Sequence, residues 1–223
     1  MEKREFFTDF FVFCCIMEMI PNKKKAGCCM PFYQRLLGHT WMILRHKFWV
    51  FYFCVIAGIP WQGLIHDLSK FSPVEFLEGV RYYNGKISPI RISKEKHNGF
   101  SMAWIHHHGR NLHHYEAWFD NFDHGPVARD MTYKYAVEMV CDCLGAGKAY
   151  GRSAFSLQAE YYGWWKRRLA NGCGMSDHMK DFMEEVLSRL AKTNSLRILR
   201  PKSLRDIYER NVGKYHREDT LFI

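Results

Sequence analysis

A histidine and an aspartate stand next to each other at positions 66 and 67, within the stretch Trp61–Phe71 that reads WQGLIHDLSKF. Imidazole nitrogens and carboxylate oxygens both bind divalent cations of intermediate hardness. An apolar run, Phe48–Trp61, leads into the pair, and burying ionisable groups against such sequence is costly unless they are paired or ligated. The dipeptide therefore predicts a metal site.

Further potential ligands come from separate parts of the chain. Ten of the twelve histidines lie between His39 and His124, and residues 106–114 read HHHGRNLHH. His39 and His46 are seven residues apart, so on a helix they share one face. Glu138 and Asp142 are four residues apart and also share one helix face. Bundles build interior metal sites from such side chains on separate helices.

The segments that carry these residues are predicted to be helical. Apolar residues recur at helical spacing over 32–57, and Gly58 and Pro60 end that run. A short helix is expected over 62–67. Ser72 then provides an N-cap, Pro73 a first helical residue and Glu75 a capping box, which starts a helix that ends near residue 83.

The rest of the chain follows the same pattern. Residues 86–96 are polar and are expected to form a loop. Four further helices are predicted over residues 131–144, 156–171, 177–193 and 204–214. Gly145 and Gly147 are expected to end the first of these. Because alternating strand patterns are almost absent, the predicted fold class is all-α, a helical bundle.

Length and composition indicate a folded protein with one large domain. The chain has 223 residues, and aromatic residues make up 16% of it, which provides enough apolar surface for a core. Residues 1–30 are interpreted as an N-terminal appendage. Residues 31–223 are interpreted as the metal-binding domain, with a core over about 35–150 and C-terminal helices within 156–214.

The charge of the chain narrows the choice of partners. A formal net charge of +9 favours anionic partners, which include nucleotides, nucleic acid and acidic lipid.

The eight cysteines lack zinc-knuckle spacing and are expected to be reduced. Charged residues interrupt the apolar stretches 6–20 and 41–60, so no membrane span and a cytoplasmic location are expected. The sequence leaves the oligomeric state open.

Three motifs in the chain resemble a known superfamily. The upstream histidine, the sequence HDLSK and a distant helical aspartate resemble the HD-domain superfamily of metal-dependent phosphohydrolases. A closer likeness is to an uncharacterised bacterial and phage family with the motifs HDLSKF-S-P-x-E-F, A-W-x-HH-x-x-RN-x-HH and E-M-x-x-D-x-x-GAG. These occur at 66–76, 103–114 and 138–147, and the likeness spans about residues 35–150. It implies an HD-like helical bundle.

The resemblance also implies ligands for one or two divalent metal ions, with Mn, Fe, Co, Ni, Zn and Mg left open. The first ion would be held by His39, His66, Asp67 and Asp142. His46 remains a rival for the upstream position of His39. A second ion would take one or two ligands from a group of four histidines, His106, His107, His113 and His114.

The implied activity is hydrolysis of a phosphate ester, with a small phosphorylated substrate of the nucleotide type. A divalent ion activates a water for attack on phosphorus. Asp67 is suited to bridge two ions, and Lys70 and Arg110 are candidates for binding phosphate. Lys70 could instead be a favourable charge at a helix C-terminus, and Glu138 could instead orient a ligand imidazole.

Two other functions compete with hydrolysis. Related helical His/Asp scaffolds can hold two irons and activate dioxygen, and a histidine-rich site suits that chemistry too. A basic surface could also bind nucleic acid in a non-enzymatic module with a structural metal. Metal identity and the salt dependence of nucleic-acid binding distinguish these alternatives.

Overall fold

The computed structural model describes residues 30–120, 123 and 125–215. The chain divides into two units, residues 1–31 and 32–223. The predicted appendage at residues 1–30 lies, apart from Met30, outside the described residues, so that boundary stays a prediction.

Helices account for most of the described chain, and the predicted all-α fold class is confirmed. The α-helices are α2 (Phe32–Ile56), α3 (Pro60–Ile65), α4 (Pro73–Tyr82), α5 (Pro89–Lys96), α6 (Met102–Arg110), α7 (Tyr133–Gly151), α8 (Lys166–Ala170), α9 (Asp177–Thr193) and α10 (Pro201–Asn211). A π-helical segment, η5 (Ala159–Trp165), precedes α8, and short 3-10 turns include η1 (Leu68–Phe71). Two-residue strands β1 (Phe119–Asp120) and β2 (Val127–Ala128) pair antiparallel.

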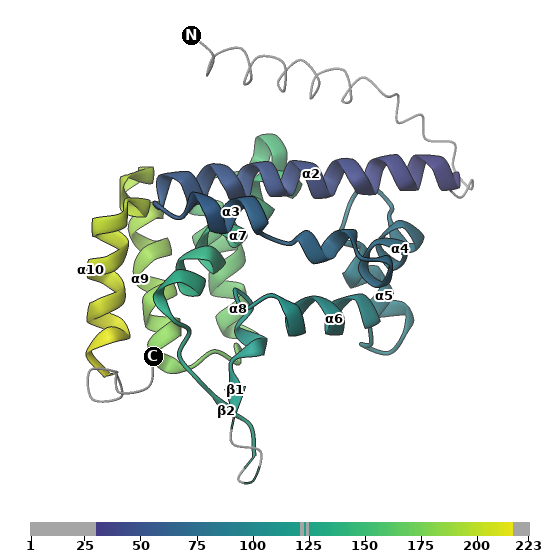
Figure 1. The fold of residues 1–223 in the computed structure, drawn as a ribbon. Helices are drawn as coiled ribbons and strands as arrows, with labels where there is room; N and C mark the ends of the chain where they lie inside the picture. The colour runs from purple at the N-terminus through teal and green to yellow at the C-terminus, as the bar shows by residue number, and fades with distance from the viewer. Residues whose placement is uncertain (1–29, 121–122, 124, 216–223) are drawn as a thin grey trace. The chain divides into compact units, whose positions relative to one another are not determined.

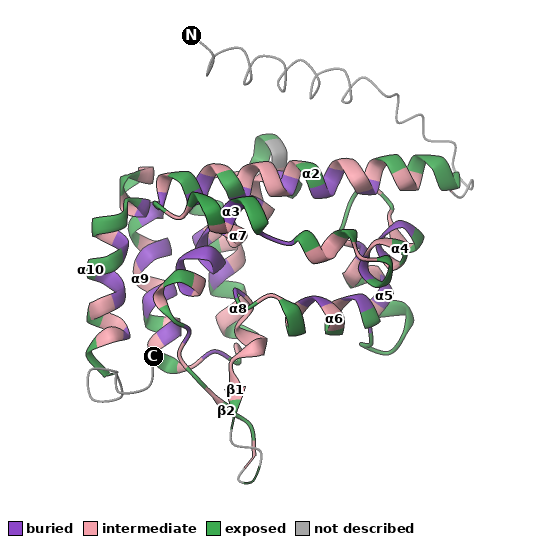
Figure 2. Cartoon of the chain, in the orientation of Figure 1, coloured by how far each residue is buried: buried purple, intermediate pink, exposed green. Residues whose placement is uncertain are grey.

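The long helix α2 organises the domain. Helices α3 and α7 pack along it, α4, α5 and α6 gather at one end, and α9 and α10 lie at the other (Figure 1). The main apolar core fills the space among α2, α7, η5, α9 and α10, with Trp165 and Phe182 fully buried. Figure 2 shows the buried residues on the inner sides of these helices.

Local sequence signals placed several helix boundaries. The helix predicted over 32–57 is α2, and the one predicted over 177–193 is α9. Ser72 caps α4 as predicted, since its Oγ accepts from the backbone N–H of Glu75. The loop predicted over 86–96 was wrong, because Pro89 begins α5 there, in the first helical position that suits proline.

Gly145 and Gly147, which were expected to end this helix, lie inside α7. Gly145 is there because α7 packs closely against α2 at this point. A Cβ atom at position 145 would lie 2.5 Å from Val50 Cγ2 and 3.0 Å from the Val50 backbone nitrogen. Only a residue without a side chain lets α7 approach α2 so closely. The cost of glycine in a helix, about 1 kcal/mol relative to alanine, is offset by this packing.

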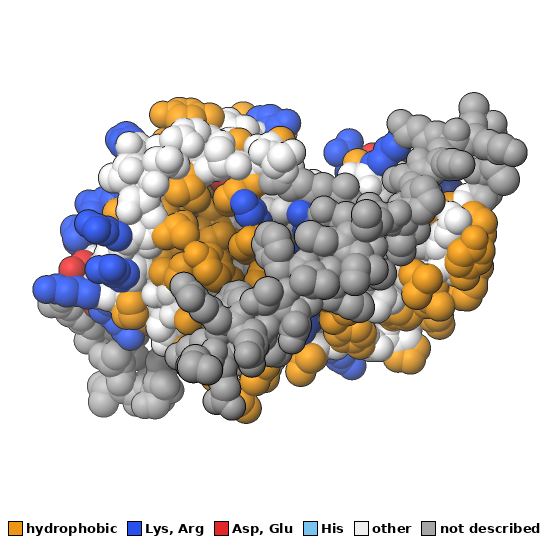
Figure 3. Space-filling view, turned by 90° about the horizontal axis from the view of Figure 1, so that it is seen from above, with side chains coloured by type: hydrophobic (Ala, Val, Ile, Leu, Met, Phe, Trp, Pro, Cys, Tyr) orange, Lys and Arg blue, Asp and Glu red, His pale blue; other side chains and the backbone are white. Residues whose placement is uncertain are grey.

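Part of the excess positive charge lies on the exposed surface of α10. Figure 3 shows Lys and Arg side chains gathered mainly at the end of the visible face where α10 lies, and Lys202, Arg205 and Arg210 of α10 are exposed. No described helix is long and apolar enough to cross a membrane. The described cysteines, Cys54, Cys141, Cys143 and Cys173, are all free thiols.

Replacing Gly145 tests the close contact between α2 and α7. In Gly145→Ala the added methyl overlaps Val50, and overpacking of this kind lowers the free energy of unfolding by about 1–3 kcal/mol, measured by urea denaturation. The control is Gly109→Ala in α6, where a Cβ would meet nothing within 4 Å. Equal stability of Gly145→Ala and the wild type would contradict the proposed role of Gly145.

Candidate metal centre

The His66–Asp67 pair occupies the short link between α3 and η1. Gly63 lets α3 lie against α2, because a Cβ at that position would be 3.0 Å from Phe51 Cα. Lys47 of α2 donates hydrogen bonds to the carbonyl oxygens of Leu64 and His66, which end α3. These contacts fix the pair against α2.

The backbone of Asp67 has an unusual conformation. Its φ angle is +53°, in the left-handed region, where few residues other than glycine are found. Such a conformation costs of order 1 kcal/mol and persists only where the surroundings impose it, often at functional sites. Here it turns the chain so that the side chains of His66 and Asp67 point into the same buried space, and each is only 1% exposed.

The first group of potential ligands joins three parts of the chain. Its members are His46 of α2, His66 and Asp67 of the link, and Asp142 of α7. The Nε2 atoms of His46 and His66 are 3.3 Å apart. Asp142 Oδ1 lies 3.1 and 3.4 Å from those two nitrogens, and Asp67 Oδ2 lies 3.5 and 3.2 Å from them.

These separations fit atoms that share one cation. Metal–nitrogen and metal–oxygen bonds of about 2.1 Å place neighbouring ligand atoms about 3.0–3.4 Å apart in octahedral or tetrahedral geometry. Five pairs in the first group measure 3.1–3.5 Å. The first group could therefore hold a metal ion without rearrangement of the backbone.

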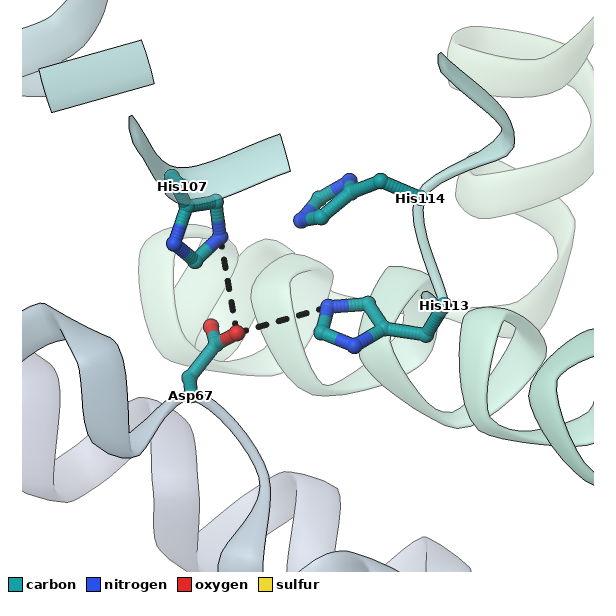
Figure 4. A group of neighbouring side chains, drawn as sticks. All are labelled: Asp67, His107, His113 and His114. Atoms are coloured by element: carbon teal, nitrogen blue, oxygen red, sulfur yellow. Dashed lines mark ion pairs between the residues drawn. The ribbon is translucent and has the colours of Figure 1, made fainter. Parts of the chain in front are cut away.

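The second group uses the other oxygen of Asp67. Figure 4 shows the carboxylate facing His107 of α6 together with His113 and His114 from the segment that follows. Asp67 Oδ1 lies 3.4 Å from His107 Nε2 and 3.3 Å from His113 Nε2. One carboxylate thus belongs to two adjacent candidate sites, with a different oxygen facing each.

Two buried glutamates hold the imidazoles from behind. Glu138 of α7 lies 2.9 Å from Nδ1 of His66 and 3.2 Å from Nδ1 of His113. Glu75 of α4 lies 2.8 Å from Nδ1 of His107. A histidine whose Nδ1–H donates to a carboxylate keeps its Nε2 lone pair for a cation, which is the usual arrangement around protein-bound metals.

His66, His113 and Glu138 also lie close enough to form a third group of ligands. A cation there would need the Nδ1 atoms of both imidazoles, which are the atoms that face Glu138. We interpret this group as a carboxylate that accepts hydrogen bonds from both rings, because both Nε2 atoms then remain directed at Asp67.

Unsatisfied atoms show that the residues present fit a cation. Asp67 Oδ1 and the Nε2 atoms of His113 and His114 have no hydrogen-bond partner, whereas Asp67 Oδ2 lies 2.5 Å from Lys70 Nζ. Buried polar atoms without partners are rare and costly. Oxygen and imidazole nitrogen atoms facing one space form a donor set that a divalent ion would satisfy.

The charges of the site favour a cation as well. Burial alone raises the pKa of the Asp67 carboxyl, but the charges of His66 and Lys70 outweigh it and hold that pKa well below its ordinary value. The pKa of Asp142 also lies well below its ordinary value, since the contacts of its carboxylate with His46 and His66 outweigh the effect of burial. Both carboxylates are therefore ionised at neutral pH.

A cavity of about 240 Å³ opens onto the cluster. Lys70 lines it, and the pKa of Lys70 is raised because the negative charges of Asp67 and Asp142 outweigh the effect of burial. The remaining lining residues come from α2, α4, α5, α6, α7 and the segments between them: His39, Met42, Ile43, His46, Asp67, Glu75, Gly79, Ser88, Pro89, Ile90, Trp104, His107, His114, Asp142, Ala146 and Tyr150.

The structure places His46, and not His39, beside the other ligands. The two residues are two turns apart on α2, about 10 Å along the axis, so they cannot both reach one ion. His39 packs against Gly79 of α4, where a Cβ would lie 2.1 Å from its Nε2 atom, and against the Phe76 ring. The preference for His39 over His46 is therefore corrected.

Two other predicted residues lie beside the cluster without joining it. His106 binds the second oxygen of Glu75, with Nδ1 at 2.7 Å, and belongs to none of the candidate ligand groups in the described part of the chain. Arg110 is the exposed last residue of α6 and does not line the cavity. Its neighbour Asn111 takes the inward position and donates to Ser69 Oγ and to the His107 carbonyl.

The sequence patterns contained signals for the residues that were missed or misread. Glu75 was interpreted as part of a capping box, yet its side chain binds His106 and His107 instead of returning to the helix start. Its place within the first motif, eight residues after Asp67, was the available signal. The alternative role considered for Glu138, which was to orient an imidazole, agrees with its contact to His66.

Fold and site together define an all-α protein with a buried His/Asp cluster that could hold metal. The chain matches the Family of unknown function (DUF5662) over residues 36–189, and because this is more than half of the chain, the protein belongs to that family. No curated protein and no solved structure matches the chain. The resemblance to the HD-domain superfamily stays a prediction.

Substitution of the two histidines of α2 tests the ligand assignment. We expect His46→Gln to weaken binding of Mn²⁺ or Zn²⁺ at least tenfold, since loss of an outer hydrogen-bond partner alone costs about 10–100-fold. His39→Gln is the matched control and should bind metal like the wild type. Calorimetric titration with the metal measures both. Wild-type affinity in His46→Gln would contradict the assignment.

The buried position of His39 predicts a pH effect on stability. Burial, with a smaller effect of the Lys70 charge, lowers the pKa of His39 from 6.5 to about 4. As the pH falls from 6.5 to 4, the unfolded chain gains this proton and the folded chain does not, so the free energy of unfolding decreases.

We therefore expect His39→Gln to lose less stability than the wild type between pH 6.5 and pH 4, by about 1–3 kcal/mol. Urea denaturation of the metal-free proteins at several pH values measures the difference. The exposed residue His97 supplies the control, His97→Gln, which should follow the wild type. Parallel curves for His39→Gln and the wild type would contradict the prediction.

Proposed function

We propose that this protein is a metal-dependent phosphohydrolase that acts on a nucleotide or a related phosphate ester. The observation that supports the proposal most is the sharing of Asp67 between two adjacent groups of potential ligands. A bridging carboxylate between two cations is a typical arrangement of enzymes that displace a group at phosphorus. The cavity gives a small substrate access to the same carboxylate.

The donor set favours particular cations. Five imidazoles, those of His46, His66, His107, His113 and His114, accompany Asp67 and Asp142 in the two groups. Nitrogen donors suit Mn, Fe, Co, Ni and Zn better than Mg, which prefers oxygen ligands and retained waters. A divalent cation here would supply a water of lowered pKa as nucleophile and would neutralise charge on the phosphoryl group.

The residues of the chain would position the reaction. His66 and Asp142 would fix one cation and His107 and His113 the other, while Asp67 would set the distance between the two. Lys70, whose ammonium lies 2.5 Å from Asp67, provides a positive charge at the cavity wall for a phosphoryl oxygen. The exposed side chain of Arg110 is left without a role in this proposal.

The competing functions lead to different measurements. An iron-dependent oxygenase would consume dioxygen and show redox-sensitive spectra, whereas a hydrolase works with redox-inert ions. The exposed basic side chains of α10 favour an additional contact with an anionic partner, but they do not line the cavity. A nucleic-acid-binding module would bind with a steep dependence on salt, even without Asp67.

Removing the shared carboxylate tests the proposed hydrolase. We expect the purified wild-type protein to contain a divalent metal and to hydrolyse members of a phosphate-ester panel in its presence. Asp67→Asn should lose metal from both groups and lower kcat by at least about 100-fold, because the ligand and the charge are both removed. Elemental analysis and phosphate release provide the two readouts.

The control for this variant is Asp120→Asn on the exposed β1 strand, where the aspartate side chain is 71% exposed. Circular dichroism should show that both variants keep the helical fold. Full hydrolysis by metal-free Asp67→Asn, or dioxygen consumption by an iron-loaded wild type without hydrolysis, would overturn the proposed function.

A further inference from the structure

The cavity beside the metal centre indicates what kind of ester the site accepts. Resting on the proposed function, and narrowing it from nucleotides to smaller esters, we propose that the substrate is a phosphate monoester of a small, largely apolar alcohol or phenol. Polyphosphates and nucleic-acid phosphodiesters are then poor substrates. Three properties of the cavity favour such a substrate: its position, its charge and its size.

The cavity leads directly to the shared carboxylate. Asp67, His46 and Asp142 line it, so a group that enters it meets the first ligand group. Tyr150 also lines the cavity, and because this residue is 42% exposed, the lining reaches solvent there. A phosphoryl group at the cluster would therefore leave its organic substituent between the cluster and Tyr150.

The charge of the cavity suits one phosphate group. Among the described residues that line it, Lys70 is the one lysine or arginine, against the carboxylates of Asp67, Glu75 and Asp142. The net charge of these side chains is −2. Two bound divalent cations would change it to +2, and a hydroxide nucleophile would lower it to +1. A phosphate monoester with a charge of about −1.5 to −2 at pH 7 nearly balances this.

A polyphosphate chain fits this environment poorly. Its extra phosphate groups would enter a half-buried space that offers no further lysine or arginine among the described lining residues. Uncompensated charge in such a space is strongly disfavoured. Proteins that bind nucleoside triphosphates instead cradle the outer phosphates with backbone N–H groups, lysine and metal ions.

The size and chemistry of the walls limit the organic group. The volume of about 240 Å³ lies below the roughly 300–1,000 Å³ of pockets for drug-sized ligands. The apolar part of the lining consists of Met42, Ile43, Pro89, Ile90, Trp104 and Ala146. It has room for one compact apolar substituent, whereas a phosphodiester carries two.

The selectivity of the metal-loaded full-length protein tests the inference. The probes are 4-nitrophenyl phosphate, bis(4-nitrophenyl) phosphate and ATP. We expect kcat/KM for the monoester to exceed the other two values by about 100-fold, a ratio within reach of pocket contacts that leave groups unpaired. An equal or higher kcat/KM for ATP or for the diester would overturn the inference.

A charge added to the apolar wall provides a second measurement. In Ile90→Arg the guanidinium would supply the missing counterion, and the ratio of kcat/KM for ATP to that for the monoester should rise about tenfold. The matched control is Ile87→Arg, because Ile87 is exposed, lies three residues earlier and does not line the cavity. An unchanged ratio in a folded, metal-loaded Ile90→Arg would contradict the charge argument.

Binding separates this inference from the proposed hydrolysis. If no probe is turned over by the metal-loaded protein, the hydrolase function fails, and calorimetry with phenylphosphonate and tripolyphosphate still decides what the cavity accepts. We expect phenylphosphonate to bind at least about tenfold more tightly, which corresponds to about 1.4 kcal/mol. Tighter binding of tripolyphosphate would overturn the inference whatever the activity.

Discussion

The burial of one carboxylate is the constraint on which the rest of the site depends. Asp67 is 1% exposed, and its backbone lies in the left-handed region. A buried charge of this kind is tolerated only when opposite charges or good hydrogen bonds surround it. Imidazoles from α2, α6 and the 113–114 segment, together with Lys70, provide that surrounding, so the helices must converge on this point.

The convergence is achieved by close helix packing and by buried acidic residues. Gly63 and Gly145 let α3 and α7 approach α2, which brings His66 and Asp142 level with His46. Glu75 and Glu138 then fix the rings from behind, on helices separated by more than fifty residues. The same helix contacts therefore determine both the packing of the fold and the orientation of the potential ligands.

A substrate would reach the cluster through a mostly apolar cavity. Lys70 carries the one ammonium among the described residues that line it, and this ammonium is already paired with Asp67. Most of the charge available to an anion must therefore come from bound cations. The other described lysines and arginines do not line the cavity, and those of α10 are exposed. The net charge of +9 consequently says little about the chemistry at the cluster.

Sequence patterns alone determined the helical class and the starts of α2, α4 and α9, and they singled out the His66–Asp67 pair. Periodicity and capping are local, so the N-cap at Ser72 and the bounds of α9 followed from short stretches. The pair at 66 and 67 stood out because ionisable residues in apolar sequence need partners. Local signals failed where glycine served packing, as in α7, where Gly145 lies inside the helix it was expected to end.

Only the tertiary structure decided which histidines meet Asp67. His39 and His46 lie on the same face of α2 and are equivalent by spacing, and the position of α7 along α2 selects His46 by placing Asp142 3.1 Å from it. Likewise, His106 and His107 are neighbours in sequence, but the helix turns one toward Glu75 alone and the other toward both Glu75 and Asp67. Spacing defines faces, whereas coordination needs distances, and distances arise from packing between helices.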